Sequence, residues 1–130
     1  MGVQTDETAS LAIPMAPVTA FDAIANGRRR HVLLSLSLSR TEDALTVGDL
    51  AVEIAAIENE IDPSQVSGDE RTSVYISLIQ SHLDTLDEAG AIDYDRRSKT
   101  VAATDATESL AEYIRRLQTT YYKPNSEADA

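Results

Sequence analysis

The sequence predicts a mainly α-helical fold with one small β-hairpin, built as a single domain around one core. Over most of the 130 residues, apolar side chains recur at steps of three and four, which is the spacing of an amphipathic helix. Between residues 92 and 103 the period changes to two, as in paired strands. Three helical segments follow a Ser, Thr or Asp with an acid three residues later, a pattern typical of helix starts.

The N-terminal part predicts an arm followed by two helices. Residues 1–17 are small and polar and contain two prolines, so we expect a flexible arm. Val18, Phe21 and Ile24 predict a first helix, which Asn26-Gly27 can end in a left-handed cap. A second segment starts at Arg28, and the alternation over residues 34–38 leaves open whether it ends as a helix or a strand.

The remaining chain predicts three more helices and the hairpin. The first, 46–61, begins at the pair Thr46 and Asp49 and stops before Pro63. The longest, 69–89, follows Ser67 and Glu70, and Gly90 closes it. The hairpin over 92–103 has a basic tip, and the pair Asp105 and Glu108 opens a final helix over 105–122. Residues 123–130 predict a disordered tail.

Charge is distributed unevenly along the chain. The net charge is −11, yet no Asp or Glu occurs in 23–41, 71–83 or 96–104, and eight of the eleven basic residues lie in these windows. The pattern indicates surfaces that accept a polyanion, although buried helices with few exposed positions would also lack acids. Abundant acids with nine arginines and two lysines are typical of a protein from molar salt, where the screening length is about 3 Å and only local charge matters.

The order of elements is that of a winged helix-turn-helix with an added C-terminal helix. In this fold the helix before the hairpin enters the DNA major groove, and the hairpin, or wing, contacts the backbone or the minor groove. With 69–89 projected as a regular helix, the core side consists of Tyr75, Ile76, Ile79, Leu83 and Leu86. The outer side is neutral in its first half and acidic in its last turns, so the predicted base-reading residues are Thr72, Ser73, Ser77 and Gln80. The alternative is a solvated face without a partner.

The predicted contacts to the DNA backbone are basic. Arg71, Arg96, Arg97 and Lys99 lie at the start of the long helix and on the wing. Arg28, Arg29 and Arg30 begin the second helix, where such modules can meet the backbone, but we expect at least one of them to pair with Asp22, Glu42 or Asp43. His82 falls at the edge of the core side, and we expect it to be a packing residue.

Two segments resemble a known family. The run from Ser81 to Asp95, SHLDTLDEAGAIDYD, contains the pattern HL-x-x-L-x-x-AG-x-[VI]-x-Y-D, which recurs in haloarchaeal winged helix-turn-helix transcription regulators, and AIANGRRR at 23–30 is similar to the end of their first helix. The similarity spans about 18–117 and departs at Asp84, where many relatives carry proline. Size and absence of cysteine are also similar to a homodimeric regulator of this group that responds to reactive oxygen species, so the resemblance implies an oxidative-stress role.

We therefore predict a homodimeric, sequence-specific DNA-binding transcription regulator adapted to high salt. Its DNA-binding domain is 18–104. The helix 105–122 is the predicted dimer element, through the stripe Leu110, Ile114, Leu117 and Tyr121. Two copies would read a pseudo-palindromic site with half-sites about 34–36 Å apart, with salt ions at the interface. The alternative is a winged-helix protein-interaction module that does not bind DNA.

Several classes of function are not expected. The sequence has no cysteine, two distant histidines and no metal-binding motif, so we expect no metal site and no cofactor. It also lacks a nucleophile–base pair and a phosphate loop, which argues against an enzyme. No apolar run is long enough to cross a bilayer and no secretory signal is visible, so we expect a cytoplasmic protein without membrane contact.

Overall fold

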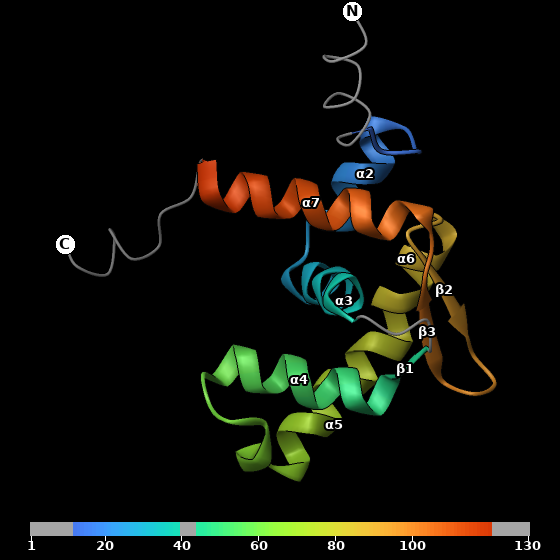
Figure 1. Cartoon of the computed structure of the whole chain (residues 1–130). Coiled ribbons are helices and arrows are strands. Elements are labelled where there is room, and N and C mark those ends of the chain that lie inside the picture. Colours follow the sequence, from blue (N-terminus) through green and yellow to red (C-terminus); the bar gives the residue numbers. More distant parts are fainter. Residues whose placement is uncertain (1–11, 40–43, 121–130) are drawn as a thin grey trace, which may run out of the picture.

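In the computed structural model, which describes residues 12–39 and 44–120, helix α3 (Gly27–Leu38) lies in the middle of the molecule. Helix α7 (Asp105–Thr120) lies on one side of it and helix α4 (Val47–Asn59) on the other (Figure 1). Helix α2 (Pro17–Ile24) precedes α3. Ile13 and Met15, which come before α2 in the chain, pack against the core. The predicted arm 1–17 is therefore too long, because residues 13–15 are attached to the domain.

Three short strands form an antiparallel sheet in the order β1-β3-β2. Strand β1 (Leu45–Thr46) pairs with β3 (Thr100–Ala103), and β3 pairs with β2 (Ile92–Asp95). The β2–β3 hairpin extends from the helices as a wing (Figure 1). The fold is thus mainly α with a β-hairpin wing, and the predicted winged helix-turn-helix with an additional C-terminal helix is confirmed. The alternating residues 34–38 belong to helix α3, which ends at Leu38, so this segment ends as a helix and not as a strand.

The core is mainly aliphatic and draws on every α-helix. Each fully buried aliphatic side chain contributes about 1.5–3 kcal/mol to the free energy of unfolding. Helix α7 supplies Leu110 and Ile114, which are buried within this single chain, and half-buried Leu117 packs beside them. The prediction that Leu110 and Ile114 form an outer dimer stripe is therefore wrong, because a core this small needs the apolar side of its terminal helix. Tyr121 and the predicted tail 123–130 lie outside the described residues.

Helix starts follow the predicted polar pairs in two of three cases. Ser67 Oγ accepts from Glu70 N at 3.1 Å while Glu70 Oε1 accepts from Ser67 N at 2.8 Å, and Thr46 Oγ1 accepts from Asp49 N at 3.0 Å. For α7 the cap lies one residue earlier than predicted, where Thr104 Oγ1 accepts from Ala106 N at 3.2 Å.

The Asn26-Gly27 pair also acts at a helix start. Asn26 has extended backbone angles, and its side chain accepts hydrogen bonds from Arg28 N and Arg29 N. It caps the beginning of α3, so the expectation of a left-handed end to the first helix is wrong.

The long helix predicted over 69–89 is interrupted by one turn of π-helix. Helix α5 (Gly68–Ser77) continues through the π turn Leu78–His82 into α6 (Leu83–Glu88), and Leu83 N donates to Leu78 O across five residues. The buried side chains of this segment are Val74, Leu78, Leu83 and Leu86. The step of five between Leu78 and Leu83 is too long for one α-helical turn, and the wider π turn brings both leucines into the core.

The π turn shifts the buried side of α5 by one residue, or about 100° of rotation. Val74 and Leu78 are fully buried, and Tyr75 and Ile79, which were predicted in the core, are half-buried and pack against its edge. Ile76, also predicted in the core, is 42% exposed. Ser77 turns inward instead, and its Oγ is buried without a hydrogen-bond partner among the described residues. The prediction of Ser77 as an outer, base-reading residue is therefore wrong.

The inward position of Ser77 predicts that Ser77→Ala stabilises the protein. A buried hydroxyl without a partner costs about 1–3 kcal/mol, and alanine removes it. Ser73→Ala is the matched control, because Ser73 lies exposed on the same helix and shares the gain in helix propensity. We expect the free energy of unfolding of Ser77→Ala, from denaturant titration, to exceed that of Ser73→Ala by about 1 kcal/mol. Equal values would place Ser77 on the surface.

Candidate nucleic-acid interface

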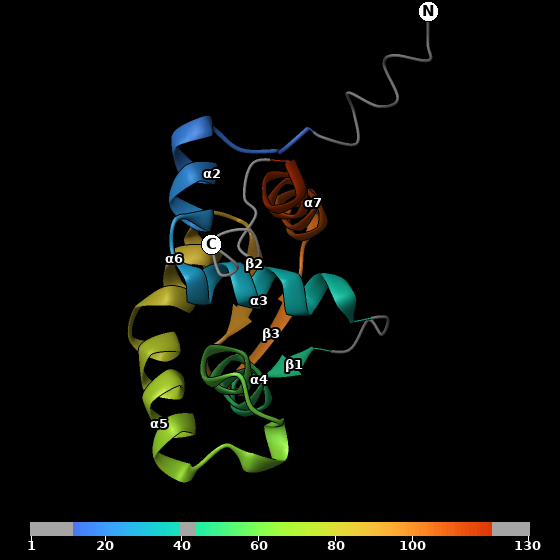
Figure 2. The ribbon, with the colours of Figure 1, turned by 90° about the vertical axis from the view of Figure 1, so that its left-hand side faces the viewer.

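The exposed face of α5 is mostly uncharged. Thr72, Ser73 and Ile76 are exposed on α5, and Gln80 is exposed on the π turn that follows. In Figure 2, α5 and α6 form one edge of the molecule with α7 on the opposite side. Three of the four predicted base-reading residues, Thr72, Ser73 and Gln80, therefore lie where a ligand can reach them.

Acids border this face at the start of α5. Asp69 and Glu70 line a shallow groove together with Ser73 and with the paired Arg28 and Glu58. Negative groups favour the start of a helix, and Glu70 also completes the cap of α5. A phosphate would be repelled at this edge, so the part of the face suited to an anionic partner begins at Thr72 and runs toward Gln80.

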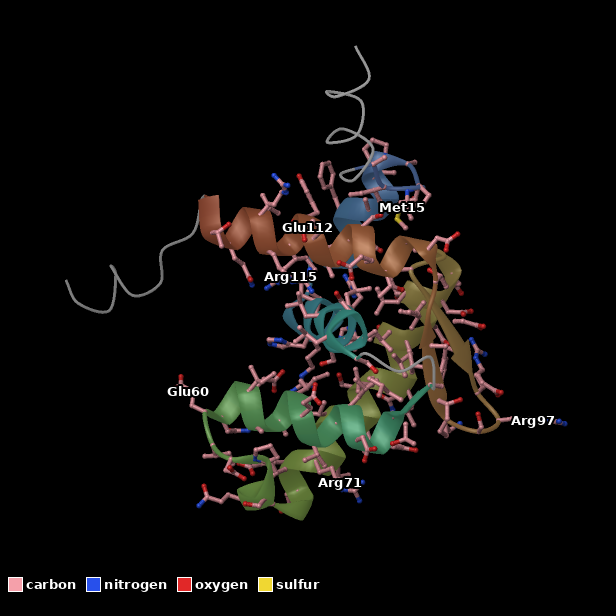
Figure 3. All side chains as sticks on the ribbon, in the orientation of Figure 1. Met15, Glu60, Arg71, Arg97, Glu112 and Arg115 are labelled. Atoms are coloured by element: carbon pink, nitrogen blue, oxygen red, sulfur yellow. The ribbon has the colours of Figure 1, made fainter. Side chains whose placement is uncertain are left out.

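Arg71 of α5 lies beside the exposed face of this helix, and its side chain reaches toward the start of α4. Its side chain is exposed and makes no hydrogen bond or ion pair in the described part of the chain. Its Nη1 lies 3.8 Å from the position that a Cβ on Gly48 would occupy. The neighbouring Val47 N donates to Lys99 O at 2.9 Å, which joins the start of α4 to the wing. Arg71 and the wing therefore lie at the same end of the molecule, as Figure 3 shows for Arg71 and Arg97.

The tip of the wing is a tight turn that presents Arg97. Asp95 Oδ1 accepts from Arg97 N at 2.9 Å and from Ser98 N at 3.3 Å. Lys99 has a φ of 57°, a left-handed conformation that costs a non-glycine residue roughly 1–2 kcal/mol. Its Nζ donates to Arg96 O at 2.8 Å, while the Arg97 side chain is exposed, has no partner in the described part of the chain and points away from the body (Figure 3).

Two acids of α6 hold the wing in place. Asp84 accepts from Arg96 Nη2 at 2.5 Å, and Asp87 Oδ1 accepts from Tyr94 N at 3.0 Å. Arg96 is still largely exposed, and such surface pairs contribute only about 0–1 kcal/mol. The acids expected to face outward in the last turns thus contact the wing.

The cluster Arg28, Arg29 and Arg30 is used inside the domain. Arg28 forms a two-point pair with Glu58 of α4, at 2.7 and 2.9 Å, and this hydrogen bond raises the pKa of Arg28. Arg29 donates to Asp22 O at 2.6 Å and to Ala23 O at 3.3 Å, and lies 3.8 Å from the Asp22 carboxylate. Arg30 donates to Ile24 O at 2.7 Å.

The guanidinium groups of these three residues therefore hold α2 and α4 around the start of α3. The expectation that one of them pairs with Asp22 is confirmed. Each of the three guanidinium groups already has a partner within the domain, which argues against their predicted contacts to the DNA backbone.

His82 of the π turn touches this arginine cluster. Its Nδ1 lies 3.3 Å from Arg29 Nη1, so the ring accepts this hydrogen bond when it is neutral. Burial lowers the pKa of His82 from 6.5, and the positive charges of Arg29 and Arg28 lower it further. The histidine is half-buried and packs where the π turn meets α3, as a packing residue should.

Ile76 was not predicted to be exposed at the interface. The signal was present in the spacing of Val74, Leu78, Leu83 and Leu86, whose steps of four, five and three fit the core only with a π turn. A projection at constant rotation turned Ile76 inward and Ser77 outward, and the structure reverses both.

The described residues offer no metal site and no membrane segment. Within 12–39 and 44–120, no three acidic or histidine side chains come together as metal ligands. In the same ranges no helix combines the length and apolar character required to cross a bilayer.

Comparison with known proteins gives one match. The model of the family described as "Domain of unknown function (DUF7344)" matches residues 21–102, which is more than half of the chain and runs from α2 through most of the wing. No curated protein and no solved structure matches.

The lowered pKa of His82 predicts a loss of stability in acid. The unfolded state binds the proton more tightly, so the free energy of unfolding falls as pH decreases through 6.5 toward the folded pKa. His31, whose pKa burial also lowers, contributes in the same direction. Denaturant titrations at several pH values should give His82→Gln a shallower dependence than the wild type, because glutamine keeps an acceptor for Arg29 and does not titrate. Identical slopes would contradict the contact.

Proposed function

The chain belongs to the DUF7344 family, and from the geometry of its exposed residues we propose that it is a sequence-specific DNA-binding transcription regulator. Helix α5 would enter the major groove, and the wing would lie along the adjacent backbone or minor groove. The residues that would read bases are Thr72, Ser73 and Gln80, and the backbone contacts would come from Arg71, Arg97 and Lys99, with Arg96 exchanging Asp84 for a phosphate.

The observation that carries this proposal is the placement of the uncommitted cations. Among the arginines of the described ranges, Arg71 and Arg97 alone have guanidinium groups without a hydrogen bond or an ion pair. Both lie at the end formed by α5, the start of α4 and the wing, on a protein whose net charge is −11. Exposed positive groups beside a neutral polar helix face suit the phosphates that border a groove.

High salt makes this arrangement workable on an acidic protein. At molar ionic strength the screening length is about 3 Å, so repulsion from distant carboxylates is lost while direct contacts between arginine and phosphate remain. Cations from solution would neutralise Asp69 and Glu70 near the DNA. The proposed place of action is the cytoplasm, where the chromosome lies.

We also propose a homodimer. Val18 and Phe21 of α2 are 74% and 56% exposed, and α2 packs against α7 at the end of the molecule away from the first turn of α5 (Figure 1). This exposed apolar pair supports a subunit contact made by α2 and α7 together, in place of the stripe on α7 alone. The role in oxidative stress stays a prediction from resemblance.

The proposal predicts that Arg97→Ala weakens binding to every duplex by a similar factor. Removing one phosphate contact should make the slope of log affinity against log salt shallower by about 0.9, because fewer counterions are released on binding. Arg116→Ala is the matched control, since Arg116 is exposed on α7 and its loss removes the same charge. Fluorescence anisotropy over a range of potassium chloride concentrations measures both. Equal slopes for the two variants would exclude Arg97 from the interface.

Gln80→Ala separates base reading from backbone contact. A side chain that pairs with a base contributes about 1–3 kcal/mol of discrimination, so the variant should lose affinity for a selected duplex and little for a scrambled one. Gel shifts in molar potassium chloride make the comparison. Equal losses would remove Gln80 from base reading, and wild-type protein that binds no duplex would favour the alternative, a winged-helix module that binds proteins.

A further inference from the structure

Ile76 is an exposed apolar side chain in the middle of a polar helix face. It is 42% exposed, lies one turn after Thr72 and Ser73, and lies one turn before Gln80. The π turn puts it there, because Val74 and Leu78 occupy the buried side of the helix. Of the large apolar side chains that are exposed in the described ranges, it is the one that lies on α5 and the π turn.

Base edges in the major groove offer polar groups and one apolar feature. Adenine, guanine and cytosine present hydrogen-bond donors and acceptors, whereas thymine also presents the C5 methyl group. The side chains around Ile76 can satisfy the polar groups. The isoleucine itself can satisfy only the methyl group.

We propose that Ile76 reads thymine through its C5 methyl group, which makes it a specificity-determining residue of the interface. This inference rests on the proposed function. A protein partner would need a continuous apolar surface, whereas the exposed neighbours of Ile76, Thr72, Ser73 and Gln80, are polar. Its apolar neighbours Tyr75 and Ile79 are half-buried against the core. Preferred sites would then contain a thymine at a fixed position in each half-site.

Replacing thymine by uracil tests the proposal, because uracil differs only by the missing methyl group. The tightest-binding duplexes are first selected from a random pool in molar potassium chloride, and each thymine is then replaced singly. For the wild type we expect about a fourfold loss of affinity at one position per half-site, the change expected for one methyl group removed from contact. Ile76→Ala should bind the thymine duplex about fourfold more weakly and should not respond to uracil at that position.

Ile57→Ala is the matched control, because Ile57 is 47% exposed on α4. It should keep both the wild-type affinity and the response to uracil. Thermal unfolding should show that both variants remain folded, since neither side chain is in the core. Wild-type binding that no uracil replacement weakens, or a response that persists in Ile76→Ala, would overturn the inference and leave DNA binding in place. Failure of the wild type to bind any duplex, or capture of a protein through Ile76, would overturn both proposals.

Discussion

The π turn between Leu78 and Leu83 decides what the long helix presents to solvent. The hydrogen bond from Leu83 N to Leu78 O spans five residues, so α5 and α6 share one helical path but differ in rotational phase. With this phase, Val74 and Leu78 reach the same core as Leu83 and Leu86. The same rotation brings Thr72, Ile76 and Gln80 onto one exposed face and leaves Ser77 Oγ buried without a partner. Packing energy of several buried aliphatic side chains outweighs the cost of one hydroxyl.

Ion pairs then determine which charges remain available. Arg28 and Arg29 connect α3 to α4 and α2, and Arg29 also supports His82 in the π turn. Asp84 and Asp87 hold the wing against α6. These contacts use Arg28, Arg29 and Arg96 internally, whereas Arg71 and Arg97, at one end of the molecule, have no partner within residues 12–39 and 44–120. The useful positive charge of this acidic protein is therefore local, which suits an environment where salt screens everything beyond a few ångströms.

Much of the fold follows from the sequence because it depends on local chemistry. The caps at Thr46 and Ser67, the glycine at 90 and the alternation in 92–103 each act within a few residues, and the element order follows from them. The phase of α5, the use of Arg28 and the burial of Leu110 depend on contacts between distant segments. A projection at constant rotation does not follow these contacts, so the predictions for Ser77, Ile76 and, as outer residues, Leu110 and Ile114 were wrong. Those for Thr72, Gln80 and Arg97 remain to be tested.

Amide chemical-shift mapping tests the central claim most directly. Spectra of ¹⁵N-labelled protein would be recorded in molar potassium chloride with increasing amounts of a short duplex. We predict the largest shift changes at the exposed face of α5, from Arg71 to Gln80, and at the wing tip around Arg97. Changes confined to α2 and α7, or no change at saturating duplex, would contradict a DNA interface formed by α5 and the wing.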